Sequence, residues 1–70
     1  MGSVLPFPGA DPDDAAVGRR LKHWRGQRGC DVDALADALK LAPDAIRRLE
    51  AGHAHMDSIQ IAAATRHLHL

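Results

Sequence analysis

The amino-acid sequence predicts an all-α protein built from short helices, and three observations support this prediction. Hydrophobic residues make up 46% of the 70-residue chain, and most of them are alanine and leucine, which favour helices. The only aromatic residues are Phe7 and Trp24, and β-branched residues are few, so a sheet is poorly supported. Apolar residues recur at intervals of three and four, which is the spacing of one helix face. A chain of this length forms one small domain with a modest core.

The first twelve residues, MGSVLPFPGADP, differ in composition from the rest of the chain. They contain three of the four prolines and two of the six glycines. Proline lacks a backbone N–H and has a fixed φ angle, so no regular helix can run through this segment. We therefore expect a flexible Pro/Gly-rich arm over residues 1–12 and a single folded domain over residues 13–70.

A first helix is predicted to begin after Asp13 or Asp14, since either side chain can cap the free amides of the first turn. It runs to about Arg28 and ends at Gly29, because glycine favours the left-handed conformation found at helix ends. Gly18 lies inside this helix at a cost of about 1 kcal/mol relative to alanine, so we expect close packing there. One face of this helix repeats at helical spacing through Val17, Leu21, Trp24 and Arg28.

The next two predicted helices are short, and only Lys40 to Ala42 separate them. Asp31 caps the second helix. Pro43 takes the first position of the third helix, where proline is favoured, and Gly52 follows its end. The inward-facing residues are Leu35, Ala36 and Leu39 in the second helix and Ile46 and Leu49 in the third.

A fourth helix is predicted to follow a cap at Asp57 or Ser58. In this helix Ile61, Ala64, Thr65 and Leu68 recur at helical spacing.

The contact between the second and third helices has the chemistry of a helix-turn-helix. Ala36 at the crossing lets two short helices meet near a right angle, because a larger side chain would hold them apart. Leu41 packs into the turn, and Ile46 fixes the third helix onto the second. In a helix-turn-helix the second helix of the pair can enter the major groove of DNA.

Together these residues resemble the pattern of a known family. From Val17 to Leu70 the chain resembles the Cro/lambda-repressor-like (XRE-type) helix-turn-helix domain, aligned without a gap. The resemblance implies a compact four-helix domain, or a truncated form of the five-helix domain that relatives commonly have. The residues that carry it are Gly18, Leu21, Arg25, Gly29, Leu35-Ala36, Ile46, Glu50-Ala51-Gly52 and the segment IAAATRHL.

The resemblance also implies a function and an internal ion pair. It implies a small DNA-binding transcriptional regulator of bacterial or phage type, with the third helix, about residues 43–51, toward the major groove. It further implies a structural ion pair between Arg25 and Glu50, which stabilises the domain only if it is partly buried and hydrogen-bonded. The residues then expected to contact duplex DNA are Lys40, Pro43, Asp44, Arg47, Arg48 and His53.

Several residues depart from the family pattern at positions that would meet DNA. Val32 stands where the family commonly has a glutamine that touches phosphate, and Lys40 replaces the usual glycine of the turn. Ala42 has no side-chain oxygen with which to cap the third helix. Pro43 and Asp44 occupy positions that often face bases. Aspartate can accept a hydrogen bond from cytosine N4, but phosphates repel its charge.

These departures leave two interpretations of the third helix open. In the first, Arg47 and Arg48 donate to phosphate or to guanine. In the second, one of these arginines pairs locally with Asp44 on an exposed face. The degenerate helix-turn-helix then acts as a protein-interaction or dimerisation module with little or no DNA binding. The acidic side chains of Asp33 and Asp37 on the second helix favour a protein partner or a second copy of the chain.

The charge balance permits DNA binding without requiring it. The formal net charge is zero, but from Val17 onward nine basic residues face six acidic ones. Strong DNA-binding domains usually carry a larger basic excess.

The histidines do not predict a metal site. His53 and His55 could chelate a metal together in an extended segment, whereas His67 and His69 on a helix would project about 200° apart. A zinc site needs three or four ligands at characteristic spacing. We therefore expect surface histidines that add positive charge at low pH.

No motif for catalysis is present, because the chain has neither a Gly-rich phosphate loop nor a nucleophile paired with a base. We expect a non-enzymatic protein with no cofactor, no small-molecule substrate and no membrane segment. Cys30 cannot form an intrachain disulfide, which fits a reducing cytoplasm and, for a DNA-binding protein, association with the bacterial nucleoid. Cys30 itself is expected to be a small apolar residue in a turn.

A homodimer, or a constitutive complex with a protein partner, is also expected. Relatives commonly have a fifth helix that closes the core or forms the dimer. Without such a helix, Ile61, Leu68 and Leu70 are expected to be left partly exposed. A protein partner, a second copy of the chain or the Leu5–Phe7 arm would cover them.

Overall fold

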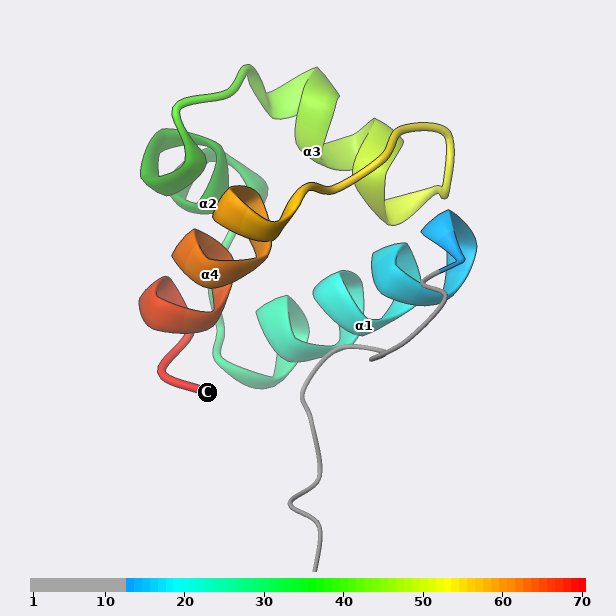
Figure 1. The fold of residues 1–70 in the computed structure, drawn as a ribbon. Coiled ribbons are helices and arrows are strands. Elements are labelled where there is room, and N and C mark those ends of the chain that lie inside the picture. The colour runs from blue at the N-terminus through cyan, green and yellow to red at the C-terminus, as the bar shows by residue number, and fades with distance from the viewer. Residues whose placement is uncertain (1–12) are drawn as a thin grey trace, which may run out of the picture.

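The computed structural model describes residues 13–70, and in this range the protein is a bundle of four helices without a strand (Figure 1). The helices are α1 (Asp14–Gln27), α2 (Val32–Leu39), α3 (Pro43–Glu50) and α4 (Ser58–His67). The predicted all-α class is therefore confirmed. The arm predicted over residues 1–12 lies outside the described residues.

Aspartate side chains cap three of the four helices, as the sequence predicts. Asp13 caps α1, and Asp31 accepts a 2.7 Å hydrogen bond from the backbone N–H of Ala34 at the start of α2. At α4 the Asp57 carboxylate accepts from the Gln60 N–H at 2.7 Å, while the Gln60 side chain accepts from the Asp57 N–H at 3.1 Å. Each cap satisfies backbone amides that the first turn leaves without an intrahelical acceptor.

The arrangement of the helices places α3 between two neighbours. α3 packs against both α1 and α2, and α2 also packs against α4. In Figure 1, α1 runs along the bottom of the molecule, α3 lies across the top, and α2 and α4 lie together on one side. None of the described helices is long and apolar enough to cross a lipid bilayer.

The hydrophobic core lies where the four helices meet. The residues predicted to face inward in α2 and α3 are all buried, and Met56, in the loop before α4, joins them although the helical spacing did not point to it. The buried core consists of Val17, Leu21, Leu35, Ala36, Leu39, Ile46, Leu49, Met56, Ala64 and Leu68.

The C-terminal end of the chain differs from its predicted exposure. Leu68 was expected to lie partly exposed, but it folds into the core and is only 1% exposed. Ile61 and Leu70 are half-buried against the same core. Among residues 13–70, the large apolar side chain that does face solvent is Ile59, which is 79% exposed near the start of α4.

Gly18 allows α1 to approach the C-terminal end of α3 more closely than any other residue could. A Cβ atom at this position would overlap the carbonyl oxygen of Leu49 and lie 2.9 Å from that of Glu50. A contact at that distance is much closer than normal packing allows. The close packing predicted for Gly18 is thus confirmed.

Replacing Gly18 by alanine is expected to lower the free energy of unfolding by about 1–3 kcal/mol, because the added methyl group must push α1 away from α3. Gly26 provides the matched control, since it lies in the same helix and a Cβ there meets no atom within 4 Å. Gly26→Ala is expected to raise stability by about 0.5–1 kcal/mol through helix propensity. Urea denaturation of both variants measures the difference. Equal effects would contradict the packing role of Gly18.

Candidate nucleic-acid interface

The turn between α2 and α3 fixes the direction in which α3 leaves the scaffold. Lys40 adopts the left-handed conformation with φ 58°, and the N–H of Leu41 donates to the carbonyl oxygen of Ala36 at 2.8 Å. This arrangement is common at the end of a helix, and glycine usually occupies its left-handed position. A lysine there costs about 1 kcal/mol, which the packing of Leu41 against the core helps to offset.

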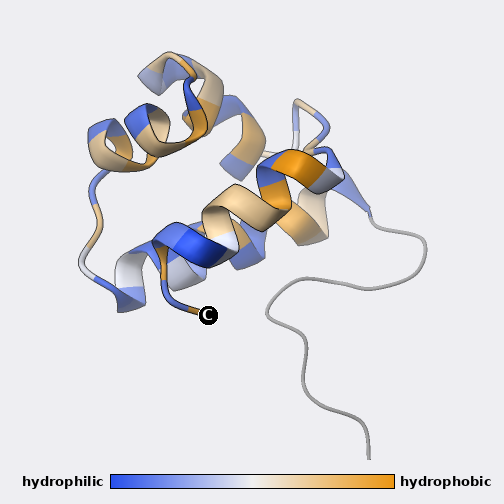
Figure 2. Cartoon of the chain, turned by 60° about the vertical axis from the view of Figure 1, so that its left-hand side comes forward, coloured by the Kyte–Doolittle hydropathy of each residue, from blue (hydrophilic) through white to orange (hydrophobic). Residues whose placement is uncertain are grey.

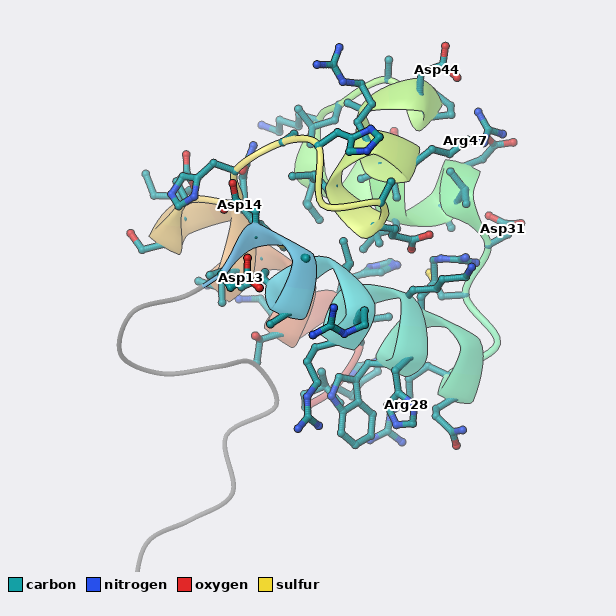
Figure 3. The ribbon with its side chains drawn as sticks, turned by 90° about the vertical axis from the view of Figure 1, so that its right-hand side faces the viewer. Asp13, Asp14, Arg28, Asp31, Asp44 and Arg47 are labelled. Carbon is teal, nitrogen blue, oxygen red and sulfur yellow. The ribbon has the colours of Figure 1, made fainter. Side chains whose placement is uncertain are left out.

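The two faces of α3 have different environments. Ile46 and Leu49 are buried at 0% and 4% exposure, so they anchor the inner face to the core. Asp44, Arg47 and Arg48 are all exposed on the outer face. In Figure 3 the side chains of Asp44 and Arg47 project outward from α3, away from the core. An exposed helix face held by a buried one is the basic geometry of a groove-reading helix.

Arg47 and Arg48 differ in their partners. Nη1 of Arg47 donates to Oδ1 of Asp44 at 2.8 Å, one helical turn away, with 61% and 90% of the two side chains exposed. Arg48 has no side-chain hydrogen bond or ion pair within residues 13–70. The local pair with Asp44 that the sequence left open therefore forms with Arg47, and the guanidinium of Arg48 faces solvent.

The remaining residues predicted to meet DNA lie at the two ends of α3. Lys40 is exposed in the turn before α3, and Pro43 is half-buried at its first position. His53 is exposed just after the helix, where its backbone N–H donates to the carbonyl oxygen of Arg48 at 2.9 Å. Ala42 makes no side-chain cap to α3, and the Ala45 N–H donates instead to the Ala42 carbonyl oxygen at 2.9 Å. This is the end of a helix that attracts anions.

Arg25 and Glu50 join α1 to the end of α3. Nε of Arg25 donates to Oε2 of Glu50 at 2.6 Å and Nη2 donates to Oε1 at 3.2 Å, while Nη1 donates to the carbonyl oxygen of Cys30 at 3.2 Å. The two side chains are 19% and 8% exposed. The hydrogen bond to Glu50 raises the pKa of Arg25 above its ordinary value, although burial opposes that shift. This bidentate pair has a structural role and holds α3 in place.

The charged residues outside α3 are separated by sign. α1 exposes Arg19, Arg20 and Lys22, whereas α2 exposes Asp33 and Asp37.

Burial raises the pKa of the half-buried Cys30 thiol, with Asp31 adding to the effect. Within residues 13–70 no group of three or more metal-binding side chains comes together.

One feature of this region is not apparent in the sequence pattern. A groove of about 200 Å³ lies between α3, the loop that follows it and the start of α4. The loop is tied back to α1 by a 2.9 Å contact between Nδ1 of His55 and Oδ1 of Asp14. Helical periodicity carries no information about how a loop returns, so sequence reasoning could not place this groove. Its lining comprises Leu41, Ala45, Arg48, Leu49, Ala54, His55 and Gln60.

Comparison with known families agrees with this geometry. The family described as helix-turn-helix domain matches residues 16–70. The chain therefore belongs to the helix-turn-helix domain family, which is consistent with the resemblance to XRE-type domains. Neither a curated protein nor a solved structure matches the chain.

Proposed function

We propose that this domain binds duplex DNA through the outer face of α3 and acts as a small transcriptional regulator of the XRE type. The observation that carries the proposal is the position of Arg47 and Arg48, which are exposed on a helix that α1 and α2 hold on its other sides. The action is non-enzymatic, and it takes place at a bacterial or phage genome in the cytoplasm.

The dimensions and chemistry of α3 support an approach to the major groove. A helix of eight residues is about 12 Å long, and the major groove is about 12 Å wide. The solvent-facing guanidinium of Arg48 can donate two hydrogen bonds to guanine or to a phosphate. Arg47 can do so after exchanging Asp44 for a phosphate oxygen, and Asp44 can then accept from cytosine N4.

The ends of α3 would supply backbone contacts. Lys40 and His53 flank the helix and can donate to phosphates on either side of the groove. Pro43 presents an apolar surface at the N-terminal end, where a thymine methyl group is a suitable contact. The basic side chains of α1 add to the positive electrostatic field but do not contribute to the recognition of a DNA sequence.

A second candidate function is a protein-interaction module in which the helix-turn-helix is only a scaffold. The ion pair between Asp44 and Arg47 favours it, because it neutralises one of the two arginines on the outer face of α3. The exposed Asp33 and Asp37 on α2 also favour it, since phosphates would repel them.

The Arg47→Ala/Arg48→Ala variant is expected to lose at least about tenfold in affinity for genomic DNA fragments, since it removes two phosphate or base contacts. The slope of log affinity against log salt concentration should become shallower by about 2 units. Mobility-shift titrations at low and moderate salt measure both quantities. The charge-matched control, Arg19→Ala/Arg20→Ala, should weaken binding only slightly, because the basic residues of α1 contribute only a long-range electrostatic attraction. Absence of any shift by the folded wild-type protein would refute DNA binding and favour the scaffold.

Asp44→Asn is expected to increase affinity for mixed DNA severalfold, because it removes a negative charge near the phosphates and releases Arg47 from its pair. Asp37→Asn makes the same change in charge on the exposed face of α2 and should have a smaller effect. Competition assays with unrelated duplexes would detect the accompanying loss of sequence preference. If the affinity for DNA were unchanged by Asp44→Asn, α3 could not lie against the phosphates as proposed.

We also propose that the regulator is a homodimer, since helix-turn-helix dimers read two half-sites related by the protein symmetry. The exposed Ile59 on α4 supports an interface there, because large apolar side chains at the surface often mark one. Light scattering at tens of micromolar should give the mass of a dimer, and Ile59→Asp should reduce it to that of a monomer. A monomeric wild-type mass would contradict the dimer but not the contact of α3 with DNA.

A further inference from the structure

A second groove lies between the C-terminal ends of α2 and α4, away from the outer face of α3. It has a volume of about 410 Å³ and is lined by Ala38, Ala63, Arg66, His67 and His69. None of these residues belongs to the interface assigned to DNA. Figure 2 shows α4 changing from hydrophobic residues near its start to hydrophilic ones in its last turn, next to the C-terminus.

The path of the chain after α4 brings two histidines to the lining of this groove. His67 and His69 would project apart on a continuous helix, but α4 ends at His67 and His69 adopts a left-handed conformation with φ 58°. The turn is closed by a hydrogen bond from the Leu70 N–H to the Thr65 carbonyl oxygen at 3.0 Å. Nη2 of Arg28 also donates to the His69 carbonyl oxygen at 3.4 Å.

The burial of Leu68 helps to explain why the chain takes this path. Its side chain is 1% exposed and fills the core at the end of α4. The residues on either side of it, His67 and His69, are both exposed. The same apolar contact that closes the core therefore holds two imidazoles at one groove.

The charges around the groove favour an anion over a metal ion. No acidic residue lines it, and Arg66 stands beside the two histidines, where its permanent charge would repel a bound cation. Near the groove, Asp37 precedes Ala38 on α2, and Lys40 lies just after the end of that helix. Arg28, just after α1, reaches the His69 carbonyl oxygen. The guanidinium fork and imidazole N–H groups are the donors that phosphate oxygens accept from.

We propose that this groove is a binding site for a phosphate monoester, held by Arg66, His67 and His69. Arg66 donates two parallel hydrogen bonds to the phosphate, and each imidazole donates one. The volume falls within the roughly 300–1,000 Å³ typical of small-molecule sites, so the groove holds more than a phosphate alone. The esterified part of the ligand lies over the small side chains of Ala38 and Ala63.

The test is a titration of the ¹⁵N-labelled full chain, followed by NMR, with inorganic phosphate and separately with adenosine monophosphate. Saturable shift changes are expected at Ala38 and over residues 63–69, with the nucleotide binding several times more tightly than phosphate. Arg66→Gln should weaken binding about tenfold, which corresponds to one charge-assisted hydrogen-bonding group. Arg20→Gln, with the same charge change on α1, should leave it unaltered. Linear shifts without saturation, or equal binding by Arg66→Gln, would overturn the proposal.

The variant His67→Ala/His69→Ala tests the two imidazoles, because each is proposed to donate one hydrogen bond to the phosphate. It should weaken the binding of adenosine monophosphate severalfold while it keeps weak binding through Arg66. Wild-type affinity in this variant would remove the histidines from the site. Neither titration involves α3, so failure here leaves the proposed contact with DNA untouched.

Discussion

The structure depends on the close contact between α1 and the C-terminal end of α3. Gly18 brings the α1 backbone against the carbonyl groups of Leu49 and Glu50. About two helical turns further along α1, Arg25 holds the Glu50 carboxylate with two hydrogen bonds. At Gly18 the two helices come close because there is no side chain between them. At Arg25 they are held together by a half-buried ion pair. Since α3 has only eight residues, it is too short to be stable alone. Its orientation comes from these contacts and from α2.

The contacts with α1 fix the C-terminal end of α3, so the start of this helix depends on its own capping and charge interactions. A helix normally begins with a side-chain cap, yet Ala42 provides none and Pro43 only reduces the number of amides that need a partner. Asp44 lies in the first turn, where the helix dipole favours a negative charge, and it also holds Arg47. The same carboxylate thus stabilises the free protein and opposes the approach of phosphates. The stability of α3 and the proposed contact with DNA make opposite demands on this one residue.

The sequence was most informative where a residue acts through its own backbone or its own helix. Asp31 and Asp57 cap the helices that follow them, and Gly18 marks a close contact, because each effect depends on a residue type at a fixed helical position. It was least informative about the segments between helices. The burial of Met56 and the turn that brings His69 beside His67 depend on how a loop returns to the core, and periodicity does not describe this. The exposures of Ile59 and Leu68 were not predicted either, since α4 is rich in alanine and its small side chains define a weak face.

A chain with zero formal net charge gains little from long-range attraction to DNA, so the separation of its charges matters more than their sum. Screening limits each charge to a range of about 8–10 Å at moderate salt, which is less than the width of this domain along any of its axes. Arg48 is exposed on α3 and Arg66 in the last turn of α4, and each of them lines a different groove. The core residues Ile46, on α3, and Leu68, at the end of α4, are both buried. For that reason a polyanion at α3 and a small anion beside α4 can be considered separately, each governed by the groups within its own screening distance.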